Sequence, residues 1–219
     1  LKEPPVERIL TPVLTGEGVI EFLGEDYAYT HALGLVQEEN GVARPANPIY
    51  GEAIARTLTN MAQLHLPESL MHRWMDEETI DVTGMLQGFQ AYWRENRDAM
   101  TAMIPYKDAA PSLALQAFLQ RVLGNEASIA RAYASNSHRV ALCIERKEKR
   151  YPVAIATSGA GGGDVRAEGI EQFSAYMDTL GQTEGWLAIF DQRPEITWDG
   201  KIYWEDVNNE STTLHIVGL

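Results

Sequence analysis

The segment 185–190 constrains the fold more than any other part of the chain. It reads Gly-Trp-Leu-Ala-Ile-Phe, an almost unbroken apolar run of strand length. A strand with one face in water alternates apolar and polar residues, whereas a continuous apolar run is typical of a central strand that is covered on both faces. The sequence therefore predicts an α/β fold in which this strand lies at the centre of a sheet and is buried on both faces.

Further strands are predicted around this run. In chain order, we expect them at residues 129–133, 140–144, 151–157, 201–204 and 212–217. A helix is expected at 167–180, after the glycine-rich loop at 159–163. Residues 126–219 would then have the order βββαβ, followed by an edge hairpin.

The first 125 residues are predicted to be mostly helical. Helical patterns occur at residues 17–23, 25–33, 49–58, 79–95 and 112–123. Gly34 is a plausible helix end, and Asn40-Gly41 favours a tight hairpin between residues 35–36 and 43–46. Helix, helix and hairpin is the outline of a winged helix. Because this lobe lacks a basic recognition helix, we expect it to be a packing or interaction module.

The chain is acidic overall, which argues against a large nucleic-acid interface. Its 219 residues include 18 Lys and Arg against 31 Asp and Glu, for a formal net charge of -13. Phosphate binding usually needs a basic face. The one local cluster of cations lies between two predicted strands and comprises Arg146, Lys147, Lys149 and Arg150. It is interpreted either as a solvated hairpin turn or as a patch that contacts phosphates.

The cysteine and histidine content and the hydropathy of the chain exclude several other classes of protein. The single Cys143 lies in a predicted strand and cannot form an internal disulfide, so we expect a buried structural thiol and a reducing cytoplasm. No apolar run is long enough for a membrane span, and the first residues do not form a signal peptide. The five histidines show no metal-ligand spacing, so we expect no metal and no membrane partner.

Several segments together carry a family resemblance. They are LGLV at 33–36, ANPIY at 46–50, LQAFLQR at 115–121, EGIEQ at 168–172, YMD at 176–178 and EGWLAIFD at 184–191. On these segments the chain resembles the C-terminal part of bacterial proteins that join an AAA-type ATPase to a PD-(D/E)XK nuclease-like domain. The resemblance implies a mixed-sheet, restriction-endonuclease-like domain at 126–219, a helical linker region at 61–125 and a winged-helix-like end of the ATPase at 1–60. No Gly-x-x-x-x-Gly-Lys-Ser/Thr is present, so this chain cannot hydrolyse ATP by that route.

The nuclease motif of that family is empty in this chain. The family places an acid on the strand after an arginine and Glu-x-Lys on the next strand. Here Arg139 is present, but the three motif positions hold Ala141, Ala154 and Ala156. Ala130 and Ala132 likewise stand where the family often has acids.

The empty positions would remove the chemistry of the site. In an intact family site, carboxylates at positions 141 and 154 would share a Mg²⁺ ion and a lysine at 156 would orient the attacking water. Alanine offers no ligand atom, proton or charge. We therefore expect an inactive nuclease-like domain without a cofactor. The alanines arose either by natural degeneration or by deliberate substitution, and the sequence leaves both open.

Gln172 and Tyr176 remain from the family's site helix. They are four residues apart and share one helix face. In RecB-like relatives such a pair lies beside the metal site and contacts nucleic acid or orders the site; the alternative is a surface glutamine and a packed tyrosine. The candidate nucleic-acid contacts are thus Arg139, Lys147, Lys149, Gln172 and Tyr176.

Two functions follow as hypotheses. In the first, the nuclease-like domain has lost its chemistry and binds DNA, RNA or partner subunits, which are either the ATPase part of the same protein or a second copy of the chain. In the second, the chain is a protein-interaction or regulatory module that docks an AAA-type ATPase and has no nucleic-acid role.

Overall fold

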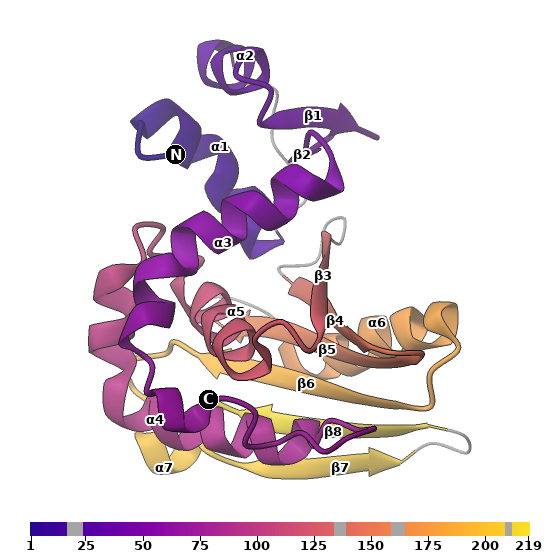
Figure 1. The fold of residues 1–219 in the computed structure, drawn as a ribbon. Coiled ribbons are helices and arrows are strands. Elements are labelled where there is room, and N and C mark those ends of the chain that lie inside the picture. The colour runs from indigo at the N-terminus through magenta and orange to yellow at the C-terminus, as the bar shows by residue number, and fades with distance from the viewer. Residues whose placement is uncertain (17–23, 134–138, 159–164, 209–211) are drawn as a thin grey trace.

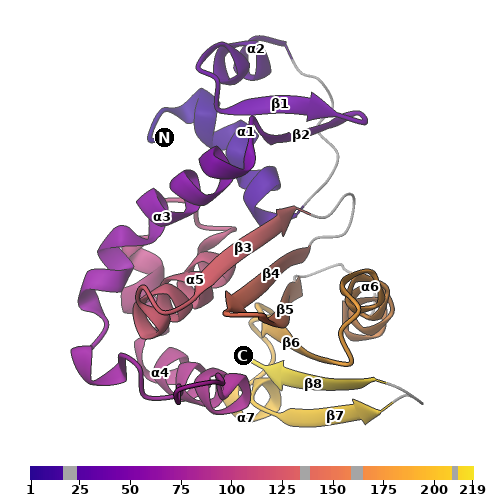
Figure 2. The same cartoon turned by 45° about the vertical axis from the view of Figure 1, so that its right-hand side comes forward.

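The computed structural model describes residues 1–16, 24–133, 139–158, 165–208 and 212–219 (Figure 1). The predicted mixed sheet is present with six strands, and helices lie on both of its faces (Figure 2). Its strands are β3 Ser128–Tyr133, β4 Arg139–Arg146, β5 Lys149–Ser158, β6 Glu184–Asp191, β7 Trp204–Asn208 and β8 Thr213–Gly218. The α/β prediction is therefore confirmed at the level of fold class.

The strand order in the sheet is β3-β4-β5-β6-β8-β7. The first three strands are antiparallel to one another, β5 and β6 are parallel, β6 and β8 are parallel, and β7 is antiparallel to β8. Residues 185–190 of β6 are all buried, as their continuous apolar character predicts.

The end of the chain differs from the prediction in one way. The strand expected at 201–204 is wrong, because Trp198–Lys201 forms the short helix α7 and β7 starts only at Trp204. The side chain of Lys201 is buried and its Nζ donates a hydrogen bond to the carbonyl of Arg193 (2.8 Å), a contact that local periodicity does not reveal. β8 lies inside the sheet and pairs with the antiparallel edge strand β7, so the two strands form the expected edge hairpin.

Two helices cover one face of the sheet and a third covers the other. α4 (Val82–Met103) and α5 (Ala110–Leu123) lie on the first face, and α6 (Val165–Leu180) lies on the second (Figure 2). Asp81 caps α4 by accepting a hydrogen bond from the Gly84 amide (2.8 Å). The aromatic side chains of Phe89 and Trp93 meet Phe190 of β6 edge to face, at 6.1 and 5.3 Å between ring centroids. Trp93 is therefore a packing residue.

The N-terminal region contains the predicted hairpin between helices. Its elements are α1 Pro4–Thr15, α2 Gly24–Ala32, β1 Val36–Glu39, β2 Val42–Pro45 and α3 Pro48–His65, and a short 3₁₀ helix follows at Glu68–Leu70. Asn40 and Gly41 both have positive φ, 54° and 80°, as a type I′ turn requires. The hairpin and the helix after it are confirmed, α1 was not predicted, and the helix expected at 17–23 lies outside the described residues.

One hydrophobic core runs through all three predicted regions. Buried side chains of α1, α3, α4 and α5 join those on one face of the sheet, for example Leu10, Leu58 and Phe118 with Val153. A second, smaller cluster lies between the other face and α6. The division of the chain at residues 60 and 125 stays a prediction. No helix in the described part of the chain combines the length and apolarity that crossing a bilayer requires.

Candidate functional site

The alanines of the predicted site lie together on one face of the sheet. In the register of β3, β4 and β5, Ala132 is opposite Ala141, Ala141 is opposite Ala154, and Arg139 is opposite Ala156. Directly opposed residues on antiparallel strands project to the same face, and so do residues two apart on one strand. Ala141 and Ala154 therefore form a row across two strands, and Ala156 lies on the same face.

α6 closes over part of this face. Ala154 and Ala156 are only 3% and 0% exposed, and they belong to an apolar cluster with Leu187 and Ile189 of β6 and with Phe173 and Met177 of α6. Gly185 allows this close approach, since a Cβ atom there would lie 2.5 Å from the Met177 sulfur. The positions that would hold Glu and Lys in an intact site are thus enclosed by hydrocarbon.

The remainder of the alanine face is less covered. α6 packs against β5 and β6, whereas Ala141 on β4 is half-buried and Ala130 on β3 is exposed. Because Ala130 is opposite Cys143 in register, it lies on the same face as the alanine row. A ligand could therefore approach this face from the side of β3 and β4, but it would meet methyl groups there.

Tyr176 and Gln172 occupy different environments on α6. Tyr176 is half-buried and its ring stacks on Phe173, with centroids 6.2 Å apart. Burial, and then the proximity of Cys143 and Glu145 on β4, raise the pKa of Tyr176. The phenol is therefore a neutral hydrogen-bonding group. Gln172 is exposed one turn away. This arrangement resembles the surface glutamine and packed tyrosine of the alternative given above.

Cys143 is a buried thiol, as predicted. It lies in β4 and is 4% exposed. Burial, followed by the carboxylate of Glu145, raises its pKa, which favours the protonated thiol. A nucleophilic cysteine needs the opposite shift. Cys143 thus fills space on the α6 side of the sheet.

The basic turn between β4 and β5 is docked against the loop at residues 76–79. Arg146 is only 8% exposed, and its Nη1 donates hydrogen bonds to the carbonyls of Asp76 (2.7 Å) and Thr79 (2.9 Å). Nζ of Lys147 donates to the carbonyl of Glu77 (2.6 Å). Two of the four cations thus bind the turn between β4 and β5 to the loop at residues 76–79. The turn is therefore not freely solvated, whereas its contact with phosphates stays a prediction.

Asp76 organises the loop that receives this turn. Its carboxylate accepts hydrogen bonds from the hydroxyl and amide of Thr79 and from the amide of Glu78, at 2.6 to 2.7 Å. The hydroxyl of Thr79, these two amides and the nearby Arg146 guanidinium lower the pKa of Asp76 to about 2. Asp76 is therefore charged at neutral pH. Sequence reasoning missed this contact because the turn and the loop that receives it are some seventy residues apart in the chain.

The histidines do not form a metal site in the described part of the chain. The ring of His215 lies between two carboxylates, with Nδ1 2.7 Å from Asp206 and Nε2 3.1 Å from Glu184. These carboxylates contact opposite sides of the ring, so they cannot bind one ion together with it. No group of three or more candidate ligands in the described ranges could hold a metal, and His138 lies outside them.

A carboxylate at the end of β6 gives a testable pH dependence. Hydrogen bonds from Arg193 are the main cause that lowers the pKa of Asp191 to about 2. Because this pKa is depressed, the stabilisation is present above the unfolded pKa of about 4 and is lost as the pH falls through about 2. We expect Asp191→Asn to lower the free energy of unfolding by about 1 kcal/mol at neutral pH, after allowance for the exposure of Arg193.

Urea unfolding at neutral pH, and at pH values between about 4 and 2, measures this effect. The difference between the parent and Asp191→Asn should shrink towards zero across that acidic range. Asp199→Asn is the matched control, since the Asp199 side chain is 93% exposed and lies 3.8 Å from Arg94. A constant difference at every pH would show that the ion pair does not cause the loss.

Comparison of the chain with family models, with curated proteins and with solved structures found no match.

Proposed function

We propose that residues 126–219 are a PD-(D/E)XK nuclease-like domain whose catalytic positions are vacated, and that the protein acts by binding. The chain order of three antiparallel strands, a helix and a parallel strand supports this proposal. It is the order that the sequence resemblance implies for the superfamily.

The observation that carries the proposal is the register of β4 and β5. Ala141 is directly opposite Ala154, and Ala156 is two residues further along β5. Opposed Cβ atoms in such a pair are about 4.5 to 5.5 Å apart, so carboxylates at these two positions could ligate one cation. A lysine at position 156 would project on the same face. This register is the one that a metal site of the family would require, and it supports the proposal.

The occupants of this face argue against catalysis. Phosphodiester hydrolysis in this family needs a metal-bound water and a positive charge beside the scissile phosphate. The three alanines provide neither, and Ala154 and Ala156 are enclosed by apolar side chains. A retained role must therefore rest on the remaining candidate contacts, which are Arg139, Gln172 and Lys149; Lys149 is exposed at the far end of β5, and its register places it off the alanine face.

We expect any nucleic-acid binding to be weak and to involve few phosphates. Arg146 and Lys147 donate to backbone carbonyls, and Arg150 pairs with Glu145 at 3.1 Å. With two or three phosphate contacts, log K should fall with log salt with a slope of about -2, because the slope is about -0.7 to -0.9 per contact. Fluorescence anisotropy on single- and double-stranded DNA and on RNA, between about 50 and 200 mM salt, measures this slope.

Two substitutions identify the contacts in that assay. Lys149→Ala should lower the magnitude of the salt slope by the amount expected for one phosphate contact. Glu168→Ala, on the exposed start of α6, should not lower it. No salt-dependent binding to any of the three nucleic acids would exclude this role and favour the second function.

The second function is a protein-interaction module that docks an AAA-type ATPase. The observation in its favour is a set of large exposed apolar side chains on α2, directly after it and on α3, comprising Tyr29, Leu33, Ile49, Tyr50, Met61 and Leu64. Those of α3 recur along the outside of an 18-residue helix. Such a surface, on a chain with a formal charge of -13, is typical of a protein interface more than of a nucleic-acid interface.

A further inference from the structure

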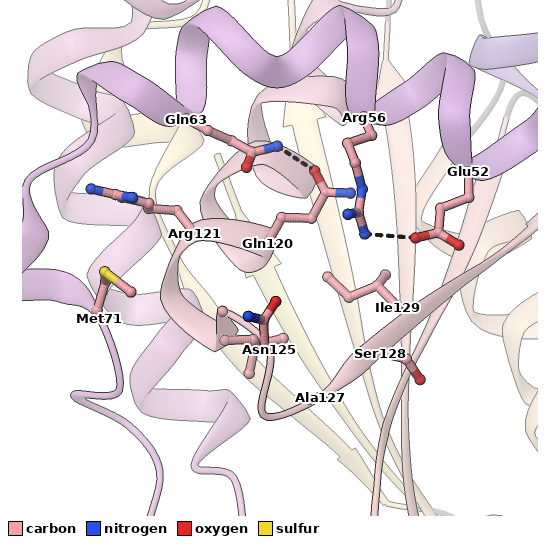
Figure 3. Close-up of a pocket in the computed structure, with 12 residues that line it drawn as sticks. Glu52, Arg56, Gln63, Met71, Gln120, Arg121, Asn125, Ala127, Ser128 and Ile129 are labelled. Carbon is pink, nitrogen blue, oxygen red and sulfur yellow. Dashed lines mark hydrogen bonds and ion pairs between the residues drawn. The ribbon is translucent and has the colours of Figure 1, made fainter.

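We infer that the pocket between α3 and α5 binds the oxyanion group, a phosphate or a carboxylate, of a small molecule. The pocket has a volume of about 460 Å³ and is bounded by α3, the last turn of α5, the following turn and the start of β3 (Figure 3). This volume is in the range of small-molecule sites. None of the alanines of the nuclease-like face lines it, so the inference is independent of the proposed function.

Two guanidinium groups give the pocket its charge. Arg56 and Arg121 line it, and Glu52 is the only carboxylate among its lining residues. A local excess of positive charge is unusual in a chain with a formal net charge of -13. Guanidinium groups bind phosphates and carboxylates through paired N–H donors. The lining thus favours an anion over a neutral or cationic ligand.

Arg121 has hydrogen-bonding capacity that the protein does not use. Its Nε is buried and has no hydrogen-bond partner. One terminal nitrogen lies 3.8 Å from the carboxylate of Glu68, whose side chain is 90% exposed. An ion pair at this distance with such an exposed partner is weak. A buried donor without an acceptor is costly, and a bound oxyanion would supply the acceptor.

Arg56 is held in place by a partner that a ligand can replace. Its Nη2 donates to Oε1 of Glu52 at 2.7 Å, one helical turn earlier on α3 (Figure 3). Both side chains are more than half exposed, 68% and 54%, so the pair contributes little to stability. The remaining nitrogens of Arg56 are available to a ligand, but Glu52 also repels it.

Gln120 presents the donor end of its amide. Its Oε1 accepts a hydrogen bond from Nε2 of Gln63 (2.7 Å), and this fixes the orientation of the amide. The NH₂ group of Gln120 then points towards Arg56 (Figure 3). A second donor therefore lies beside the Arg56 guanidinium, whereas Arg121 lies on the other side of Gln120 and extends away from Arg56 (Figure 3).

The end of α5 does not supply competing acceptors. Three of its last four carbonyls are already bonded: Gln120 O accepts from the Gly124 amide (3.1 Å), Val122 O from the His72 amide (2.9 Å) and Leu123 O from the Glu126 amide (3.1 Å). The negative end of a helix normally disfavours anions. Here three of those groups are occupied, and Arg121 in the last turn opposes their partial charge.

Isothermal titration calorimetry with inorganic phosphate tests the inference, with succinate as the carboxylate arm and sodium chloride at matched ionic strength as the reference. We expect phosphate or succinate to bind and chloride not to bind. Arg121→Gln should weaken binding about tenfold, the size of one charge-assisted hydrogen bond of about 1.4 kcal/mol. Glu52→Gln should strengthen it about threefold or more, because the competing carboxylate is removed.

The matched control is Arg94→Gln, which removes a 57% exposed arginine of α4 that does not line the pocket. Its affinity should equal that of the parent. Equal signals from chloride and both oxyanions would overturn the inference, and so would equal affinities of Arg121→Gln and Arg94→Gln. Should Arg121→Gln fail to fold, the absence of stronger binding in Glu52→Gln would overturn it as well.

Discussion

The combined substitution of Ala141→Asp, Ala154→Glu and Ala156→Lys is expected to lower the free energy of unfolding by about 3 to 5 kcal/mol when no divalent cation is present. Ala154 and Ala156 are almost fully buried among apolar side chains of α6 and β6. Larger side chains there would displace α6, and uncompensated buried charges are costly. Urea unfolding in the presence of a chelator measures the loss.

Divalent cations should recover part of that loss. Carboxylates at positions 141 and 154 would stand directly opposite each other and repel until a cation binds between them. A cation at 100 times its dissociation constant would restore about 2.7 kcal/mol. Ala175→Glu is the control, because Ala175 is exposed on α6 and its substitution should change neither stability nor metal dependence. A triple variant as stable as the parent under chelation would contradict the packing described here.

Arg146→Met should be the most destabilising single change in the basic turn, with a loss of about 2 to 4 kcal/mol. Methionine keeps an apolar stem of similar length but removes the donor that binds the carbonyls of Asp76 and Thr79. The loop at 76–79 would then lose its main tie to β4. Thermal unfolding measures the stability, and limited proteolysis between residues 75 and 80 reports the release of the loop.

Lys149→Met is the matched control for this experiment. Lys149 lies in the same turn and is exposed, so its substitution should change the stability by no more than about 0.5 kcal/mol. Equal losses in Arg146→Met and Lys149→Met would mean that the turn is stabilised by its net charge and not by the two hydrogen bonds of Arg146.

Features set by local sequence could be predicted. The apolar run at 185–190 indicated a central strand because only a strand covered on both faces tolerates it. Asn40-Gly41 indicated the hairpin because few residue pairs adopt two positive φ angles. The shared face of Ala154 and Ala156 followed from the period of a strand. Each of these depends on neighbouring residues alone.

Features set by distant contacts could not be predicted. The docking of Arg146 needs carbonyls some seventy residues earlier in the chain. The helix α7 stands where a strand was expected, and its buried Lys201 bonds to Arg193 O outside the helix. The pocket between α3 and α5 exists only once those helices pack together. For α1 a signal was present, since Val6, Ile9, Leu10 and Val13 have helical spacing.

The most direct test of the vacated nuclease site is a combined Mn²⁺-binding and cleavage assay on the parent and on the triple variant with Ala141→Asp, Ala154→Glu and Ala156→Lys. The parent should neither bind the ion at this face nor cut single-stranded DNA, double-stranded DNA or RNA. The folded variant should bind about one ion per chain, because two opposed carboxylates supply oxygen ligands. Cleavage by the variant would indicate that the alanines replaced a working site, and binding without cleavage would indicate natural degeneration. Metal-dependent cleavage by the parent, or a folded variant that binds no metal, would contradict the account.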